Sequence, residues 1–210
     1  MIRWANAWRT TRRTSGTLAI AALLGAGMAG SVQARDRVDQ QNPIGDGGGF
    51  GIGISQSPNE AQTFTAGKTG KLDRVAVDLS PTGGTVPKGT MIAEIFPTDE
   101  HGAPDTDAAA LASGQVKSKA VSRNGGFVSI RLDEKLPIAE DTVYAIVLHA
   151  DAALAGALSW DGSSGPPDPD QYPRGTQAEL VNNTWVLHEG QDFHFKTYVA
   201  VHHHHHRHHR

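Results

Sequence analysis

The sequence contains no cysteine among its 210 residues. Disulfides, thiol nucleophiles and cysteine-ligated zinc are therefore excluded. A chain of this length without cross-links needs a real hydrophobic core to be stable. Long hydrophobic runs are also missing, because the apolar stretch from Leu18 to Ala29 is well short of the ~20 residues that a helix needs to span a bilayer. The sequence therefore predicts a protein that does not span a membrane.

Acidic residues are absent from the first 34 residues, which carry four arginines: Arg3, Arg9, Arg12 and Arg13. The apolar stretch follows, and then Val32-Gln33-Ala34 places small residues where a signal peptidase cleaves. This order predicts a signal peptide over residues 1–34 and a secreted or periplasmic protein. The Arg12-Arg13 pair leaves the twin-arginine route open, but the general secretory route is favoured because Ser15 and Gly16, which follow the pair, are not apolar.

Basic residues are in the minority beyond the leader. Four of the 19 basic residues precede residue 35, whereas all 22 acidic residues follow it, so residues 35–210 carry a net charge of −7. Such a chain has no electrostatic reason to bind nucleic acid or an anionic membrane.

Helical periodicity is missing as well, and an apolar period of two takes its place from residue 61 onward. Short strands are predicted at 61–66, 75–79, 90–96, 127–132, 142–148, 185–187 and 193–201. Proline- and glycine-rich turns separate them, and nothing supplies the helices that parallel crossovers need. The sequence thus predicts an all-β protein, an antiparallel β-sandwich or a barrel, over residues 61–201.

Several details of this sandwich can be predicted. Eight side chains are expected between its two sheets: Val75, Val77, Ile95, Val128, Ile130, Val147, Phe193 and Phe195. Residues 142–148 are apolar on both faces, which favours a central strand covered on both sides. Residues 35–60 are predicted to be a loose, glycine-rich entry segment, and residues 161–177 a long loop.

Six segments occur in an order that resembles a known family. They are Gln62-Thr63-Phe64-Thr65-Ala66-Gly67, Gly70-Lys71-Leu72-Asp73-Arg74-Val75, Leu111-Ala112-Ser113-Gly114, Tyr144-Ala145-Ile146-Val147-Leu148, Ser159-Trp160 and Asp192-Phe193-His194-Phe195-Lys196-Thr197-Tyr198-Val199. Over about residues 60–199 the chain resembles the choice-of-anchor domains (R type), which are jelly-roll modules of bacterial secreted and surface proteins. The resemblance implies a two-sheet sandwich with its first and last strands side by side. It also implies a non-catalytic role similar to that of carbohydrate-binding modules, with a glycan or a cell-surface component as partner.

Aromatic residues are few, and three of them are candidates for stacking on a sugar ring: Trp160, Tyr172 and Trp185. Asp161 and neighbouring aspartates and asparagines supply groups that bind hydroxyls. For both tryptophans the sequence favours burial in the core, because large aromatics are usually mostly buried. Tyr172, within a proline- and glycine-rich stretch, is expected to be the most exposed of the three.

Metal-ligating residues gather in the tail: His202, His203, His204, His205, His206, His208 and His209. Such a run is expected to be disordered without metal and to bind Zn²⁺ or Ni²⁺ with little selectivity. A tail without a selected metal role is favoured, because composition alone supports such a role. That tail is either solvated or an expression remnant, although Arg207 interrupts the run in a way not typical of a standard tag. Two acidic loops, with Asp99, Glu100, Asp105 and Asp107 in one and Asp168 and Asp170 in the other, leave a Ca²⁺ site open, although neither has a Ca²⁺-loop spacing and solvated loops are favoured.

Catalytic motifs are missing. The chain has no nucleophile elbow and no His-Glu-x-x-His run, and His149 and His188 are more typical of satisfied polar groups on strands than of bases. The sequence therefore predicts a non-enzymatic binding or adhesion module. The alternatives are an exported metal-binding protein and, further off, a jelly-roll hydrolase that uses two carboxylates across a groove.

Overall fold

The computed structural model describes residues 36–43, 49–83, 85–164 and 170–200. The predicted signal peptide and the His-rich tail lie outside the described residues. The described residues all belong to one unit of the chain. Its described part is all-β with one short 3-10 turn, η1 (Ser118–Ala120), so the predicted fold class is confirmed. No helix among the described residues is long and apolar enough to cross a membrane.

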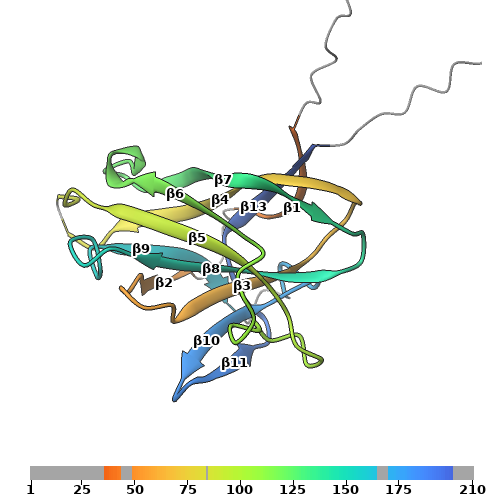
Figure 1. Ribbon diagram of the computed structural model, residues 1–210. Helices are drawn as coiled ribbons and strands as arrows, with labels where there is room; N and C mark the ends of the chain where they lie inside the picture. The colour runs from red at the N-terminus through yellow and green to blue at the C-terminus, as the bar shows by residue number, and fades with distance from the viewer. Residues whose placement is uncertain (1–35, 44–48, 84, 165–169, 201–210) are drawn as a thin grey trace, which may run out of the picture. The chain divides into compact units, whose positions relative to one another are not determined.

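Thirteen strands cover most of the described residues (Figure 1). They are β1 (Asp36–Asn42), β2 (Gly49–Gly53), β3 (Glu60–Thr65), β4 (Gly70–Pro81), β5 (Thr90–Pro97), β6 (Ala112–Lys117), β7 (Gly126–Ile138), β8 (Val143–Ala150), β9 (Leu158–Ser164), β10 (Gln177–Val181), β11 (Thr184–His188), β12 (Gln191–Phe193) and β13 (Phe195–Ala200).

The strands pair antiparallel in two stacked layers (Figure 1). The first layer has the order β1-β13-β4-β7, and β9 continues it by pairing with the end of β4 and with β2 and β12. The second layer has the order β6-β5-β8-β3-β10-β11. Gly114 on β6 faces Leu132 on β7 and joins the two layers at one side. The first and last strands of the described chain, β1 and β13, lie side by side.

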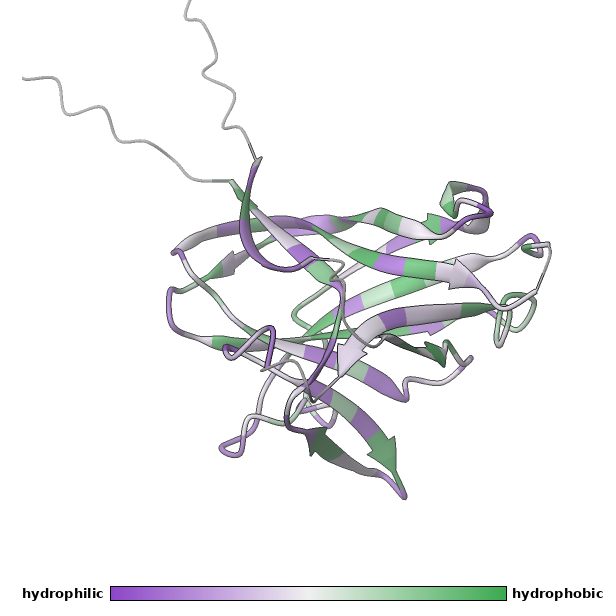
Figure 2. Ribbon diagram, turned by 180° about the vertical axis from the view of Figure 1, so that it is seen from behind, coloured by the Kyte–Doolittle hydropathy of each residue, from purple (hydrophilic) through white to green (hydrophobic). Residues whose placement is uncertain are grey.

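Apolar residues alternate with polar ones along the strands (Figure 2), and the apolar set meets between the layers. All eight side chains predicted for the core are buried. Seven of them belong to the main cluster between the layers, but Val147 does not. Its neighbours Ile146 and Leu148 face the main core instead, because successive side chains of a strand point to opposite faces.

Val147 belongs to a second apolar cluster on the outer face of the second layer. Its buried members are Ala61, Phe96, Ala145, Val147 and Ala178, against which Ala110, Trp185 and Leu187 pack. The prediction that residues 142–148 form a central strand covered on both sides is confirmed, since β8 lies between β3 and β5 and contributes to both clusters.

Two segments predicted as loops contain strands instead. Residues 35–60 hold β1 and β2, and residues 161–164 continue β9. In β2, Phe50 and Ile52 pack against the core while glycines occupy the opposite face. A Cβ on Gly51 would lie 2.7 Å from Asp161 Oδ1, so glycine allows β2 to approach β9 closely. The period of two was present in the sequence, but glycines hid it because they add no side chain to the alternation.

Candidate ligand-binding site

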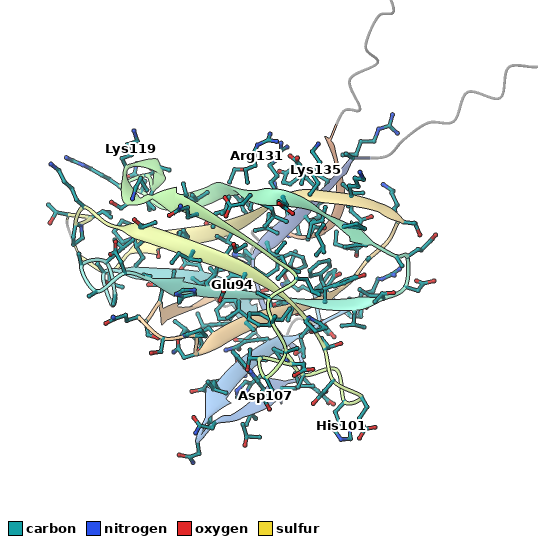
Figure 3. The ribbon with its side chains drawn as sticks, in the orientation of Figure 1. Glu94, His101, Asp107, Lys119, Arg131 and Lys135 are labelled. Atoms are coloured by element: carbon teal, nitrogen blue, oxygen red, sulfur yellow. The ribbon has the colours of Figure 1, made fainter. Side chains whose placement is uncertain are left out.

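A cavity of about 340 Å³ lies on the outer side of the second layer, between the loop that follows β5 and the β10–β11 hairpin. Figure 3 shows Asp107 and His101 on this loop, beside the hairpin. The cavity is lined by Asp99, Ala103, Pro104, Asp105, Thr106, Asp107, Asn183, Thr184 and Trp185. It therefore joins two segments that are almost eighty residues apart in the sequence.

Hydrogen bonds hold the loop in a defined conformation. Asp99 Oδ1 accepts from the backbone N–H groups of His101 at 2.8 Å and Ala103 at 2.9 Å. Thr98 and Pro104 form a β-bridge across the loop. Asp105 Oδ1 accepts from the N–H of Ala108 at 3.3 Å. Local bonds of this kind fix a loop that has no regular structure, so this wall of the cavity is preformed.

The opposite wall begins at the turn of the β10–β11 hairpin. Asn182 and Asn183 form a two-residue connection with φ angles of 51° and 63°. This is the conformation of a type I′ turn, which asparagine tolerates better than most residues. The turn places the side chains of Asn183 and Thr184 at the cavity. The hairpin was missed from sequence, although the Asn-Asn pair between two apolar segments was its signal.

Trp185 is the aromatic residue of the cavity. Its ring is half-buried, packs against the second apolar cluster and lines the cavity. Its Nε1 donates to Thr106 Oγ1 at 3.0 Å, which ties the hairpin to the loop. A ring that is fixed before a ligand arrives loses little entropy on binding.

The carboxylates around the cavity do not form a metal-binding group. Asp99, Asp105 and Asp107 all line it, yet the described residues contain no group of three His, Cys, Asp or Glu side chains able to hold a metal ion. Glu100 lies nearby on the loop and is 3.6 Å from His101. Of the second acidic loop, Asp168 lies outside the described residues, and Asp170 accepts from the N–H of Tyr172.

Trp160 is a core residue and does not form a sugar-stacking platform. It is completely buried on β9, and its Nε1 donates to the carbonyl oxygen of His194 at 3.1 Å. Its ring stacks on that of Phe193. The assignment of Trp160 as a ligand-binding residue is therefore wrong, and the expectation of burial is right, because a ring of this size stabilises the core most when it is fully desolvated.

Tyr172 is buried as well, contrary to the expectation that it would be the most exposed of the three. Its ring lies edge-on to Phe195, with centroids 4.9 Å apart, and its hydroxyl donates to Gln40 Oε1 at 2.9 Å. Burial raises the pKa of this hydroxyl. The turn folds the ring back over the end of the core, and a proline- and glycine-rich composition does not reveal such a reversal.

Asp161 follows Trp160 on β9 and therefore points to the other face of the sheet. It is half-buried, its Oδ1 accepts from Ser80 Oγ at 2.9 Å, and burial raises its pKa. Trp185 belongs to the other layer. The structure thus does not bring the predicted ligand set of Trp160, Asp161, Tyr172 and Trp185 together. It pairs Trp185 with the acidic loop instead.

Two buried carboxyl groups, those of Glu60 and Asp192, have raised pKa values. Burial raises the pKa of Glu60 to about 7 and that of Asp192 to about 7. Each side chain is nearly inaccessible, at 2% exposure, and accepts from a glutamine: Gln177 in the first case and Gln62 in the second. The histidines considered as bases face carboxylates, His149 with Glu94 at 3.2 Å and His188 with Glu179 at 3.3 Å.

A second cavity, of about 330 Å³, provides an internal comparison. It is lined by Glu94, Ala110, Leu111, Ala112, Ser113, Asp133 and Glu134. It is acidic like the first cavity but has no aromatic wall. The cavity at Trp185 is therefore the better candidate for binding an organic ligand with an apolar face.

Comparison with known proteins adds little to this geometry. Neither a family model nor a curated protein matches the chain. Among solved structures, a CocE/NonD family hydrolase from Staphylococcus aureus matches 71% of this chain and 32% of its own length, at 13% identity and a TM-score of 0.26. The chain thus spans about a third of that hydrolase.

Proposed function

We propose that the protein is an exported, non-catalytic binding module that attaches to glycans through the cavity at Trp185. One observation carries the proposal: a half-buried tryptophan ring, fixed by Thr106, lines a cavity that also contains carboxylate, carboxamide and hydroxyl groups. The apolar C–H face of a sugar packs on a flat ring, and polar groups at the sides bind its hydroxyls. The leader predicted from the sequence supports a role outside the cytoplasm.

The proposal is tested by a glycan array probed with the chain from residue 34 onward. Trp185→Ala removes the ring and is expected to abolish binding. Trp185→Phe keeps a smaller flat ring without the bond to Thr106, and is expected to retain weaker binding. Leu111→Ala is the matched control, because Leu111 is a large exposed apolar residue of the second cavity.

Thermal unfolding of each variant separates lost binding from lost folding. Arrays that stay blank, or binding that survives Trp185→Ala in a folded protein, would reject the site. Equal loss of binding in Leu111→Ala would place the ligand in the second cavity instead.

A second candidate function, metal binding, is supported by the seven histidines among residues 202–209. Imidazoles bind Zn²⁺ and Ni²⁺ when neutral. Calorimetric titration with either ion, with and without residues 202–210, is the test. Tight binding that disappears on truncation would support it, whereas weak binding alone would identify a tail with incidental affinity.

A further inference from the structure

The cavity at Trp185 has the electrostatic character of a site for a cationic ligand. Three of its lining residues, Asp99, Asp105 and Asp107, are acidic, and no lysine, arginine or histidine is among the described residues that line it. Figure 3 shows Lys119, Arg131 and Lys135 on the other side of the sandwich from Asp107. Ion pairs within the described part of the chain leave these three aspartates out. None of the described cationic side chains therefore forms an ion pair with these aspartates.

Each aspartate keeps an oxygen for a ligand. The loop's own hydrogen bonds use Oδ1 of Asp99 and Oδ1 of Asp105. The Oδ2 atoms of both residues and the exposed carboxylate of Asp107 make no hydrogen bond to other described groups. Because the three carboxylates do not form a metal-binding group, their charge suits a cation spread over an organic molecule better than a single ion.

The aromatic wall favours the same kind of ligand. A tryptophan face attracts cations as well as apolar C–H groups, and here the ring is held by Thr106. Asn183 and Thr184 add neutral hydrogen-bonding groups beside it. The side chains of Asn183 and Thr184 can bind the hydroxyl groups of a sugar ring. A ligand with only an ammonium group, such as a lysine side chain, would make no use of them. An anionic sugar would meet three like charges, which is an effective means of rejection.

We propose that this cavity selects glycans with free amino groups, such as oligomers of glucosamine, over N-acetylated, neutral or anionic glycans. The inference rests on the proposed glycan-binding function and names its ligand class. The ammonium group binds the Asp105 and Asp107 carboxylates, while the sugar face stacks on Trp185.

The test compares four oligosaccharides of equal length by calorimetry at low salt and pH 6: glucosamine, N-acetylglucosamine, glucose and galacturonate oligomers. The amine is expected to bind about tenfold more tightly than its N-acetylated counterpart, the effect of two or three exposed charge pairs. This preference should shrink as salt is added, because the charges are exposed to solvent.

Isosteric variants locate the effect. Asp107→Asn, alone and with Asp105→Asn, is expected to weaken amine binding several-fold and to weaken binding of the neutral oligomer much less, because an asparagine still binds hydroxyls but carries no charge. An asparagine at 105 can still accept from the N–H of Ala108, so the loop is preserved. Glu134→Gln, in the second cavity, removes one negative charge elsewhere and is expected to have no effect.

The outcomes separate the two proposals. If no oligosaccharide binds, glycan binding itself fails. If the N-acetylated or neutral oligomer binds as tightly as the amine through Trp185, glycan binding stands and the selectivity is rejected. If galacturonate binds best, or if an oligolysine peptide displaces the amine at equal concentration and depends on the same aspartates, the ligand class is wrong.

Discussion

The ring of Trp160 lies parallel to that of Phe193, with their centroids 4.2 Å apart and an angle of 11° between their planes. The two residues come from strands β9 and β12 and are both fully buried. Phe193 also contacts Phe50 of β2, at 5.4 Å between centroids. The packing of Phe50, Phe193 and Trp160 therefore stabilises the position of the glycine-rich strand β2 against the main core.

Replacing Trp160 and replacing Trp185 with alanine should affect the protein differently. Trp160→Ala is expected to cost about 3–5 kcal/mol of unfolding free energy, because it opens a large void in the core. Trp185→Ala should cost less, since its ring is only half-buried, and should act mainly on ligand binding. Denaturant unfolding together with the glycan assay checks both. A Trp160→Ala protein of wild-type stability would contradict the packing described for β9.

Asn183 has two roles that substitution can separate. Its φ of 63° is readily adopted by glycine but not by alanine. An alanine in this left-handed region costs the folded protein about 1 kcal/mol or more. Asn183→Gly is therefore expected to keep the stability of the hairpin while it removes the carboxamide from the cavity, and to weaken glycan binding. Asn183→Ala should lose stability as well. If Asn183→Gly binds as the wild type does, Asn183 serves the turn alone.

Glu60 and Asp192 make stability depend on pH in an unusual direction. Burial raises their pKa values to about 7, from 4.5 and 3.8 respectively. The folded protein therefore holds protons that the unfolded chain has already lost, and this contribution to stability declines as pH rises from about 4 to about 7. Neutral amides remove the effect, so Glu60→Gln and Asp192→Asn should gain stability relative to the wild type between pH 5 and pH 8.

Denaturant unfolding across this pH range measures the difference between each variant and the wild type, which cancels the titration of the histidines. Parallel profiles for variant and wild type would show that the two carboxyl groups titrate normally.

Gly114 marks the place where the two layers join. A Cβ at this position would overlap the carbonyl oxygen of Arg131 and lie only 2.9 Å from its carbonyl carbon. Gly114→Ala is expected to separate β6 from β7 and to cost about 1–3 kcal/mol. Gly53→Ala is the control, because a Cβ there meets nothing within 4 Å, and it should change stability by no more than about 0.5 kcal/mol. Thermal unfolding of the two variants measures the difference. Equal melting temperatures would contradict the close approach of β6 to β7 at Gly114.

Several features of the fold follow from local pattern. Leu72 is out of phase with the alternation of Val75, Val77 and Leu79, which is typical of a bulge or of a strand start. In the structure the pairing of β4 with β7 shifts between Leu72 and Arg74. The alternation in residues 193–199 places Phe193, Phe195 and Val199 in the core. Such patterns are readable because side chains of a strand alternate strictly between its two faces.

Other features were not readable because they depend on contacts between distant segments. His194 falls on the polar side of its alternation, yet it is buried and lies 3.0 Å from Asp78. Strand β8 is apolar on both faces, so the sequence does not show which face of the sheet Val147 occupies. The β10–β11 hairpin and the loop after β5 cover it on the outer face of the second layer. The strand β2 escaped notice because its alternate residues are glycines.

The same distinction applies to the candidate site. By itself the sequence determined the all-β class, the absence of thiol chemistry and the residue types from which a binding site can be built, because these follow from composition and from a period of two along the chain. The tertiary structure decided which tryptophan is available: Trp160 is enclosed by the core, whereas Trp185 is held beside Asp105 and Asp107. Exposure and convergence are set by pairing between strands far apart in the sequence, and no local pattern specifies which segments will meet.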